Sequence, residues 1–156
     1  DVNASLWRWT FNLAANEGAV SRRQLCALAG EFPRIDERSA GLPYCHMWFV
    51  GDRDEGSPFS RIVHWDHQTW QADVWNLPVE DCASEGVFVP RSATAPEGDG
   101  WLLSVVYRGN LGRSDLLVFD ACHLHQGPVA TVELPHRVPN GFHGNWIDAA
   151  TPLRAW

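Results

Sequence analysis

The chain has 156 residues, of which 45% are hydrophobic and 20% are charged, a composition that favours one soluble domain with a core and excludes a disordered segment. Its formal net charge is −7 and no run is rich in Lys and Arg, so nucleic acid and anionic membrane surfaces are poor partners. No apolar run approaches the roughly 20 residues that a membrane-spanning helix requires.

Short runs of alternating or continuous apolar residues follow one another along the chain, and each has the length of a β-strand. Nine Trp and seven Phe against one Met, with 13 Gly and 10 Pro, also favour strands joined by turns. A single helix is predicted, over Ser21 to Ala29 with Ser21 as its N-cap. An all-β fold is therefore expected. The predicted strands are Leu6 to Leu13, His46 to Val50, Arg61 to Trp65, Gln71 to Leu77, Gly86 to Pro90, Trp101 to Tyr107, Asp115 to Phe119, Val129 to Leu134 and Gly141 to Ile147.

The strands group into antiparallel meanders. Val63 to Trp75 reads as strand, tight turn and strand, and Leu102 to Asp120 does so again with a longer loop. Such regular spacing is typical of a sandwich, a barrel or a propeller. In a propeller, Glu85 to Leu134 would form one blade and Tyr44 to Leu77 most of another. The Trp-rich strand from Leu6 to Leu13 is expected to pair with a segment upstream of this chain.

His143 is the strongest candidate for chemistry. It lies between Phe142 and Gly144 in the segment PNGFHGNW, where most neighbours are apolar or small. An imidazole in such a place needs a hydrogen-bond partner, a metal ion or water. From the residues alone, a hydrogen-bonded core histidine is the commoner outcome.

The remaining histidines are not predicted to form a metal site. One pair flanks a turn in HWDH and another alternates in HLH, so both pairs are expected to face solvent. No role is assigned to the other two. These six residues are His46, His64, His67, His123, His125 and His136.

The four cysteines are expected to be free thiols. They are widely separated and show neither a CxxC pair nor the spacing of a zinc ribbon. A chain of this size does not need disulfides for stability. They are Cys26, Cys45, Cys82 and Cys122.

Several motifs, in this order and spacing, resemble the C-terminal part of the carotenoid cleavage oxygenases. These are non-haem iron enzymes that split carotenoids, apocarotenoids and stilbenes at a carbon–carbon double bond. The resemblance runs from about Leu6 to Trp146. The motifs are GEFPRIDER (30–38), AGLPY (40–44), SEGVFVPR (84–91), EGDGWLLSVVY (97–107), SDLLVFDA (114–121) and GPVATVELPHRVPNGFHGNW (127–146).

The resemblance implies site residues. In that family, four histidines bind Fe(II) and three glutamates accept hydrogen bonds from the outward ring nitrogens of three of them. His143 matches the fourth histidine, and Glu31 and Glu85 match two of the glutamates. An acceptor on the outward N–H fixes the tautomer and the ring angle of a metal-bound imidazole. The substrate-binding residues are not predicted.

The resemblance also implies a fold and a setting. The family forms seven-bladed β-propellers with the iron on the axis, so residues 1–156 are expected to be the C-terminal portion of one propeller domain: the last blades and the closing strand. The N-terminal blades are expected to be absent, which leaves the chain inactive alone. The implied partners are a hydrophobic polyene or stilbene, dioxygen and the missing blades. The expected location is cytoplasmic, with peripheral membrane contact only through absent segments.

A second hypothesis comes from another functional class. A β-propeller-type module that binds or scaffolds, without catalysis, would also use many tryptophans. Trp65, Trp70 and Trp75 could form a binding surface or a contact between blades. Three further strand histidines upstream would favour the enzyme.

Overall fold

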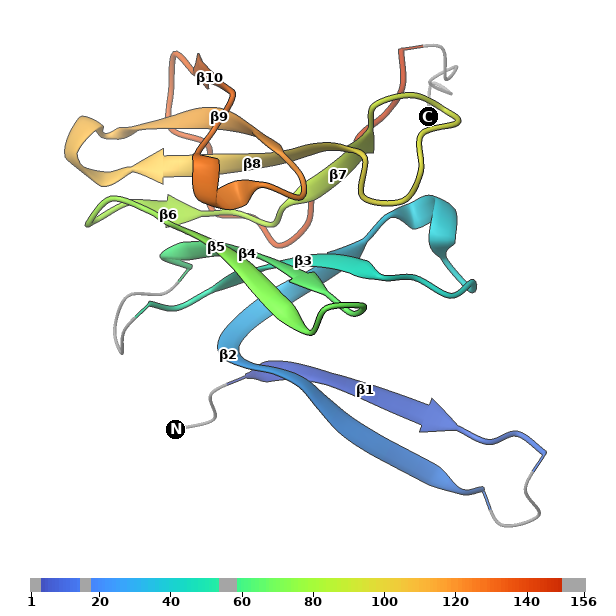
Figure 1. Cartoon of the computed structure of the whole chain (residues 1–156). Coiled ribbons are helices and arrows are strands. Elements are labelled where there is room, and N and C mark those ends of the chain that lie inside the picture. The colour runs from blue at the N-terminus through green and yellow to red at the C-terminus, as the bar shows by residue number, and fades with distance from the viewer. Residues whose placement is uncertain (1–3, 15–17, 54–58, 150–156) are drawn as a thin grey trace, which may run out of the picture.

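Alternating side chains build two antiparallel sheets in the computed structural model, which describes residues 4–14, 18–53 and 59–149 (Figure 1). The first sheet has the order β1-β2-β3-β4-β5. Its strands are β1 (Ser5–Phe11), β2 (Val20–Ile35), β3 (His46–Gly51), β4 (Arg61–Asp66) and β5 (Gln71–Asn76).

The second sheet has the order β10-β9-β8-β6, and β7 also pairs with β8. Its strands are β6 (Cys82–Ala83), β7 (Val87–Pro90), β8 (Gly100–Arg108), β9 (Arg113–Asp120) and β10 (Ala130–Glu133). Short 3-10 turns lie at Glu37–Ser39, Gly109–Leu111 and Leu124–Gln126, and the described ranges contain no α-helix. The all-β class and the two meanders are thus confirmed. Among the described residues, no helix is long and apolar enough to cross a membrane.

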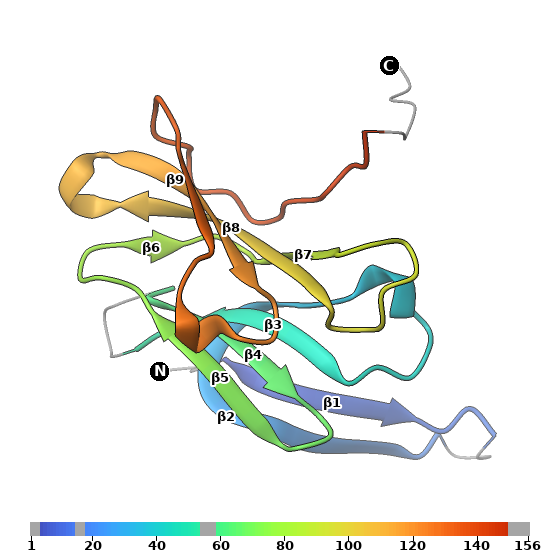
Figure 2. The same cartoon turned by 45° about the horizontal axis from the view of Figure 1, so that its top comes forward.

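The main core lies between the two sheets, which face each other across it (Figure 2). Period-2 alternation places Trp48 and Val50 of β3 in this core, whereas Met47 and Phe49 belong to a second cluster with other residues of the first sheet. Trp48 is fully buried, stacks on Phe88 with ring centroids 4.7 Å apart, and donates from Nε1 to the Ala121 carbonyl at 2.7 Å. This one side chain therefore ties the first sheet to the second.

The helix predicted over Ser21 to Ala29 is wrong, because this segment lies within β2. Residues of β2 pair antiparallel with β1, for example Arg22 with Trp9 and Gln24 with Trp7. One partner of β1 is therefore the downstream strand β2, and β1 forms the edge of the sheet within this chain, so its pairing with an upstream segment stays a prediction. Cross-strand pairing overrides the weak helical pattern of this segment.

The strand predicted over Gly141 to Ile147 is also wrong, since the segment has no regular secondary structure. It lies instead against the second sheet, where Gly144 approaches Val87 of β7. Polar contacts, and not a strand ladder, hold this segment in place.

Gly100, at the start of β8, is expected to be intolerant of a side chain. An added Cβ would lie 2.3 Å from the Val89 carbonyl oxygen and 2.8 Å from the Phe88 ring. We expect Gly100→Ala to lower the free energy of unfolding by about 1–3 kcal/mol through overpacking. Urea denaturation measures this, with Gly141→Ala as control, because nothing lies within 4 Å of its added Cβ. Equal stability of the two variants would contradict the prediction.

Candidate metal centre at His143

His143 and Glu85 lie in contact although they are 58 residues apart in sequence. The His143 Nδ1 atom is 3.1 Å from Glu85 Oε1. Because a carboxylate only accepts hydrogen bonds, this contact places the proton on Nδ1 and leaves Nε2 as the unprotonated nitrogen. The His143 side chain is 71% exposed whereas that of Glu85 is only 3% exposed, so a buried carboxylate holds an imidazole that is itself accessible.

Glu85 occupies an interruption in the inner edge of the second sheet. Strand β6 ends at Ala83 and β7 begins at Val87, and both pair with β8. The backbone stays anchored through the interruption, since the Ser84 amide donates to the Val105 carbonyl at 2.8 Å. Residues 84–86 thus leave the ladder locally, and the Glu85 side chain turns toward the segment that carries His143.

Arg34 of β2 completes this arrangement. Its Nη1 donates to Glu85 Oε2 at 2.6 Å and to the Gly144 carbonyl at 3.0 Å, and its Nη2 donates to Asn145 Oδ1 at 3.2 Å. The Gly144 amide donates to the same Glu85 Oε2 at 3.0 Å. The buried carboxylate therefore has three donors, and charge-assisted hydrogen bonds of this kind hold a loop firmly. Sequence reasoning assigned no role to Arg34, although it lies in the GEFPRIDER motif.

Phe32 packs against one side of the imidazole. Phe32 meets the His143 ring edge to face, with centroids 5.8 Å apart, and it also contacts Phe142. Phe32 has φ = 55°, a backbone conformation that costs free energy for a non-glycine residue, and it lies in an irregularity of the β2–β3 pairing between Glu31 and Arg34. This local distortion places Phe32 beside His143 and Arg34 beside Glu85.

Glu31 is placed differently from Glu85. It pairs with Val50 in the ladder between β2 and β3, and its side chain is exposed. It lies beside Phe32 and lines a cavity of about 320 Å³ with Phe49 and Pro33. The structure thus brings Glu85 to His143, while Glu31 opens onto a separate hollow.

The pair of His143 and Glu85 can offer one nitrogen ligand to a transition metal such as iron. A neutral imidazole whose other N–H is held by a carboxylate is the usual form of a metal-bound histidine. The donor chemistry therefore fits a metal ion at Nε2. One imidazole is not a complete site, so the pair can only be part of a larger centre.

His64 contradicts the prediction that the HWDH pair faces solvent. Alternation in β4 directs Ile62 to the core between the sheets and Val63 to the opposite cluster, and His64 occupies the next core-facing position with only 5% of its surface exposed. Burial, with a smaller effect of His46, lowers the pKa of His64 to about 4. The residue is neutral at physiological pH. The alternation of β4 was the signal that could have revealed this.

The other histidines are scattered. His67 is half-buried, and its Nε2 atom lies 2.6 Å from Arg8 Nη2. Burial, and to a smaller extent the charge of Arg8, lowers the pKa of His67. His123 and His125 are exposed, as predicted, and contact Asp120 and Asp73 respectively. All four cysteines are free, also as predicted.

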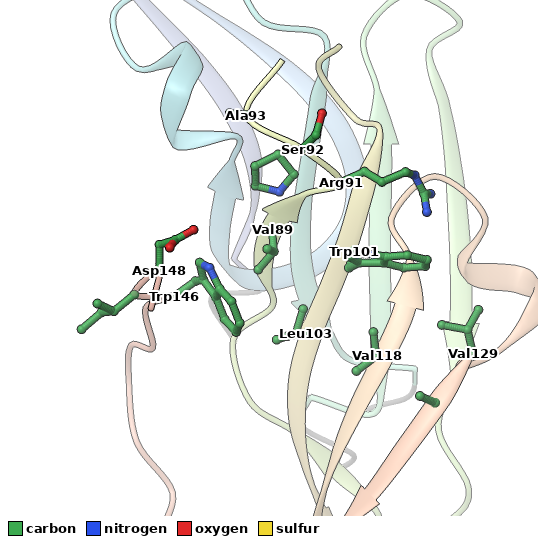
Figure 3. A pocket seen from close by; sticks show the side chains of 13 residues that line it. Val89, Arg91, Ser92, Ala93, Trp101, Leu103, Val118, Val129, Trp146 and Asp148 are labelled. Carbon is green, nitrogen blue, oxygen red and sulfur yellow. The ribbon is translucent and has the colours of Figure 1, made fainter. Parts of the chain in front are cut away.

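An apolar groove of about 1000 Å³ lies on the outer face of the second sheet (Figure 3). It is lined by Val89, Leu103 and Val118 from the strands and by Trp146 from the segment after His143. Trp146 also lines a smaller hollow of about 250 Å³ that includes His143 and Glu85. The outer face of this sheet is therefore apolar and adjoins the candidate centre.

Known proteins resemble this chain in sequence and in fold. The family model described as Retinal pigment epithelial membrane protein matches residues 1–148. The lignostilbene-alpha,beta-dioxygenase isozyme III of Sphingomonas paucimobilis is 40% identical over 157 residues, covering 93% of this chain and 32% of that protein. The apocarotenoid-15,15'-oxygenase of Synechocystis is 30% identical over 143 residues, covering 90% of this chain and 29% of that protein.

The solved structure of Pseudomonas brassicacearum lignostilbene dioxygenase superposes with a TM-score of 0.86 at 32% identity, over 93% of this chain and 32% of that chain. The chain thus spans only about a third of the length of the proteins it matches. Its two sheets form part of a β-propeller. The resemblance predicted from the motifs is confirmed, and the chain belongs to the carotenoid cleavage oxygenase family.

Proposed function

We propose that this chain is the C-terminal portion of an iron(II)-dependent dioxygenase that cleaves a conjugated carbon–carbon double bond of a carotenoid, an apocarotenoid or a stilbene to two carbonyl products. The observation that carries the proposal is the contact between His143 Nδ1 and the buried Glu85 carboxylate at 3.1 Å. It leaves Nε2 of an exposed imidazole as a metal ligand in a fixed orientation. When bound, the iron supplies the activation of dioxygen beside the alkene.

The residues of this chain position the ligand. Glu85 holds the Nδ1 proton of His143 and thereby sets its tautomer and ring angle. Arg34 and the Gly144 amide both donate to Glu85 Oε2, so the carboxylate cannot rotate away from the imidazole without losing these bonds. Phe32 packs against the imidazole and Phe142 packs against Phe32, and these apolar side chains near the ligand suit an apolar alkene.

Glu31 has a complementary role in this proposal. Its side chain is exposed and faces a hollow of about 320 Å³, where an imidazole from another part of the protein can reach it. We therefore assign Glu31 the orientation of a different iron-binding histidine. That histidine would belong to a blade outside this chain.

The proposed enzyme needs more than this chain. One imidazole and two carboxylates do not make a four-histidine centre, so the chain alone is proposed to be inactive. The missing ligands would come from N-terminal blades of the same protein. This chain matches only 29–32% of the length of its relatives, which supports this view. The uncovered apolar groove of the second sheet suits the packing of a further blade.

The substrate class rests on the relatives. Proteins named lignostilbene dioxygenase, isoeugenol monooxygenase and apocarotenoid oxygenase are all 30–40% identical to this chain. The compounds in these names, a lignostilbene, isoeugenol and an apocarotenoid, share a double bond conjugated to a ring or a polyene. We propose a cytoplasmic location, which the four free cysteines support, with membrane contact only through parts of the protein outside this chain.

The test is the iron content and the oxygen-dependent cleavage activity of the natural protein that contains this sequence. A hydroxystilbene and an apocarotenoid are offered as substrates, and carbonyl products are followed by mass spectrometry. We expect about one iron per chain and cleavage of at least one of the two. A protein that binds no iron and cleaves neither would overturn the proposal and leave a non-catalytic binding module.

A further inference from the structure

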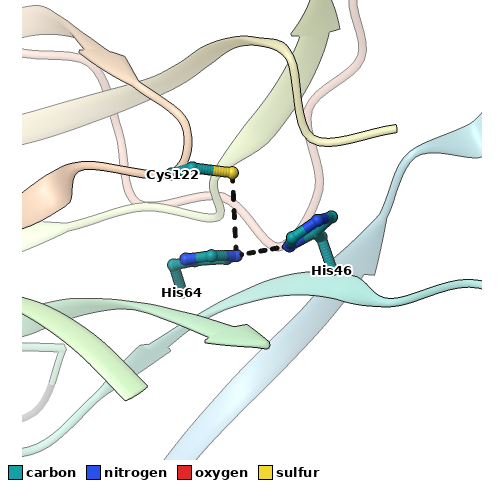
Figure 4. A group of neighbouring side chains, drawn as sticks. All are labelled: His46, His64 and Cys122. Atoms are coloured by element: carbon teal, nitrogen blue, oxygen red, sulfur yellow. Dashed lines mark hydrogen bonds between the residues drawn. The ribbon is translucent and has the colours of Figure 1, made fainter. Parts of the chain in front are cut away.

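Three side chains outside the His143 centre bring metal-binding atoms together. His46 Nδ1 lies 2.9 Å from His64 Nε2, and His64 Nε2 lies 4.0 Å from Cys122 Sγ (Figure 4). One ligand atom from each of the three residues lies within 4.8 Å of the other two. His64 is buried, and the other two residues are half-buried. We call this group the His–His–Cys cluster.

The fold draws the cluster from both sheets. His46 and His64 come from the neighbouring strands β3 and β4, where Trp48 pairs with His64 and both histidine rings stack with the Trp48 indole. Cys122 comes from the turn after β9, next to Ala121, whose carbonyl accepts from Trp48. The cluster thus bridges the junction between the sheets.

The backbone around the cluster is fixed before any ligand binds. Glu97 Oε1 accepts from the amides of Cys45 and His46 at 2.7 and 2.9 Å, and the Cys122 amide donates to Asp120 Oδ1 at 3.2 Å. Gly98 has φ = +81°, and an added Cβ would lie 2.6 Å from the His46 ring and 3.1 Å from Cys122 Sγ. Only a glycine allows this close approach, which keeps both side chains beside each other.

The spacing of the donor atoms is close to that of the ligands around a zinc ion. A tetrahedral zinc with bonds of about 2.0–2.1 Å to nitrogen and 2.3 Å to sulfur needs ligand atoms roughly 3.3–3.6 Å apart. The separations of 2.9 and 4.0 Å lie on either side of that range. Without a metal, the two imidazoles contact each other at 2.9 Å and the Cys122 thiol donates to the Gly98 carbonyl at 3.3 Å, which leaves the sulfur 4.0 Å from His64 Nε2.

The chemistry of the cluster selects the class of metal. Two neutral imidazoles and one thiolate suit borderline-soft ions such as zinc, whereas Mg²⁺ and Ca²⁺ require oxygen ligands. Burial raises the pKa of the Cys122 thiol to about 11, with smaller effects of Asp120, Asp66, Asp73 and Asp99, so the sulfur stays a protonated thiol until a cation displaces the proton.

We propose that His46, His64 and Cys122 bind one zinc ion that links the first sheet to the turn after β9. Binding forms a Zn–S bond to Cys122, releases the thiol proton to solvent, and changes no oxidation state. The half-buried positions of His46 and Cys122 leave room for a water molecule as the fourth ligand. This site is independent of His143 and of the proposed dioxygenase centre.

Cobalt(II) titration of the metal-free natural protein tests the proposal, because cobalt replaces zinc and reports sulfur ligation directly. We expect a sulfur-to-cobalt charge-transfer band in the near ultraviolet that saturates at one cobalt per chain and disappears when zinc is added. Cobalt at His143 cannot give this band, since that centre offers no sulfur. The cobalt band therefore does not depend on whether the proposed dioxygenase centre at His143 exists.

Matched variants assign the ligands. Cys122→Ser should remove the band, and His46→Gln should weaken cobalt binding, while circular dichroism confirms that both variants are folded. Cys82→Ser, which alters another half-buried free cysteine, should keep the band. Absence of the band in the parent protein, or its persistence in Cys122→Ser, would overturn the proposal.

Discussion

His143→Ala is expected to remove iron from the natural protein and to reduce double-bond cleavage to background. The variant deletes a metal ligand, and in the proposed centre no other side chain of this chain can replace it. Nine residues separate Glu133, the last residue of β10, from His143, and this segment is held by Glu85 and Arg34 rather than by a ladder, so the fold should persist. Iron per chain is measured by mass spectrometry, and cleavage is measured with the substrate that the parent protein prefers.

Glu85→Gln tests the geometric argument more finely. Gln keeps the shape and one acceptor oxygen but loses the charge that Arg34 and His143 share. Loss of such a supporting group typically costs 10–100-fold in metal affinity, so we expect an intermediate iron occupancy. His125→Ala, which alters an exposed histidine far from the centre in sequence, is the control and should match the parent protein. Full iron occupancy in both His143→Ala and Glu85→Gln would rule out this centre.

Acidification is expected to destabilise the protein through His64. In the folded state burial lowers the pKa of His64 to about 4 from 6.5. The unfolded chain therefore binds the proton more readily between these values, and stability is complete above pH 6.5 and falls as the pH approaches 4. A difference of about 2.5 pKa units corresponds to roughly 3 kcal/mol. His46 and His123 also lower this pKa, while Asp73 and Asp66 oppose them.

The measurement is urea denaturation at several pH values between 4 and 7, with a chelator present to exclude bound metal. His64→Gln is the matched variant, because a neutral amide cannot take up the proton. Its stability should vary less over this interval than that of the parent protein, by about the same 3 kcal/mol. Identical pH profiles would show that His64 does not control acid stability.

Strand alternation predicted most of the fold, whereas the sites needed contacts that are distant in sequence. The hydrophobic pattern located β3, β4, β5, β8 and β9, since each alternates between two apolar environments. It missed β2, where Gly30 and Pro33 interrupt the pattern and the backbone is locally distorted at Phe32, which contacts the distant His143. The pairing with β1 could not be seen in a segment that also reads as a weak helix.

The candidate centre was only partly accessible from the sequence. The motifs assigned His143 and Glu85 through a family resemblance, and the structure adds the reason why Glu85 can serve, which is its buried bond to Arg34. His64 appeared to belong to a polar turn because its neighbours Asp66 and His67 are polar. Its contact with His46 and Cys122 joins residues 18 and 58 positions away, and no local pattern encodes that.

The break between β6 and β7 separates two requirements that usually compete in a protein, stable strand pairing and the placement of a functional side chain. The flanking strands carry the ladder to β8, while residues 84–86 contribute little pairing and can be shaped by chemistry alone. Substitutions at Glu85 should therefore alter the centre and the segment that carries His143, while the pairing of β6 and β7 with β8 is kept. Different residues of one edge of the sheet thus specify the scaffold and the chemistry, so a change in the chemistry need not disturb the strand pairing on either side.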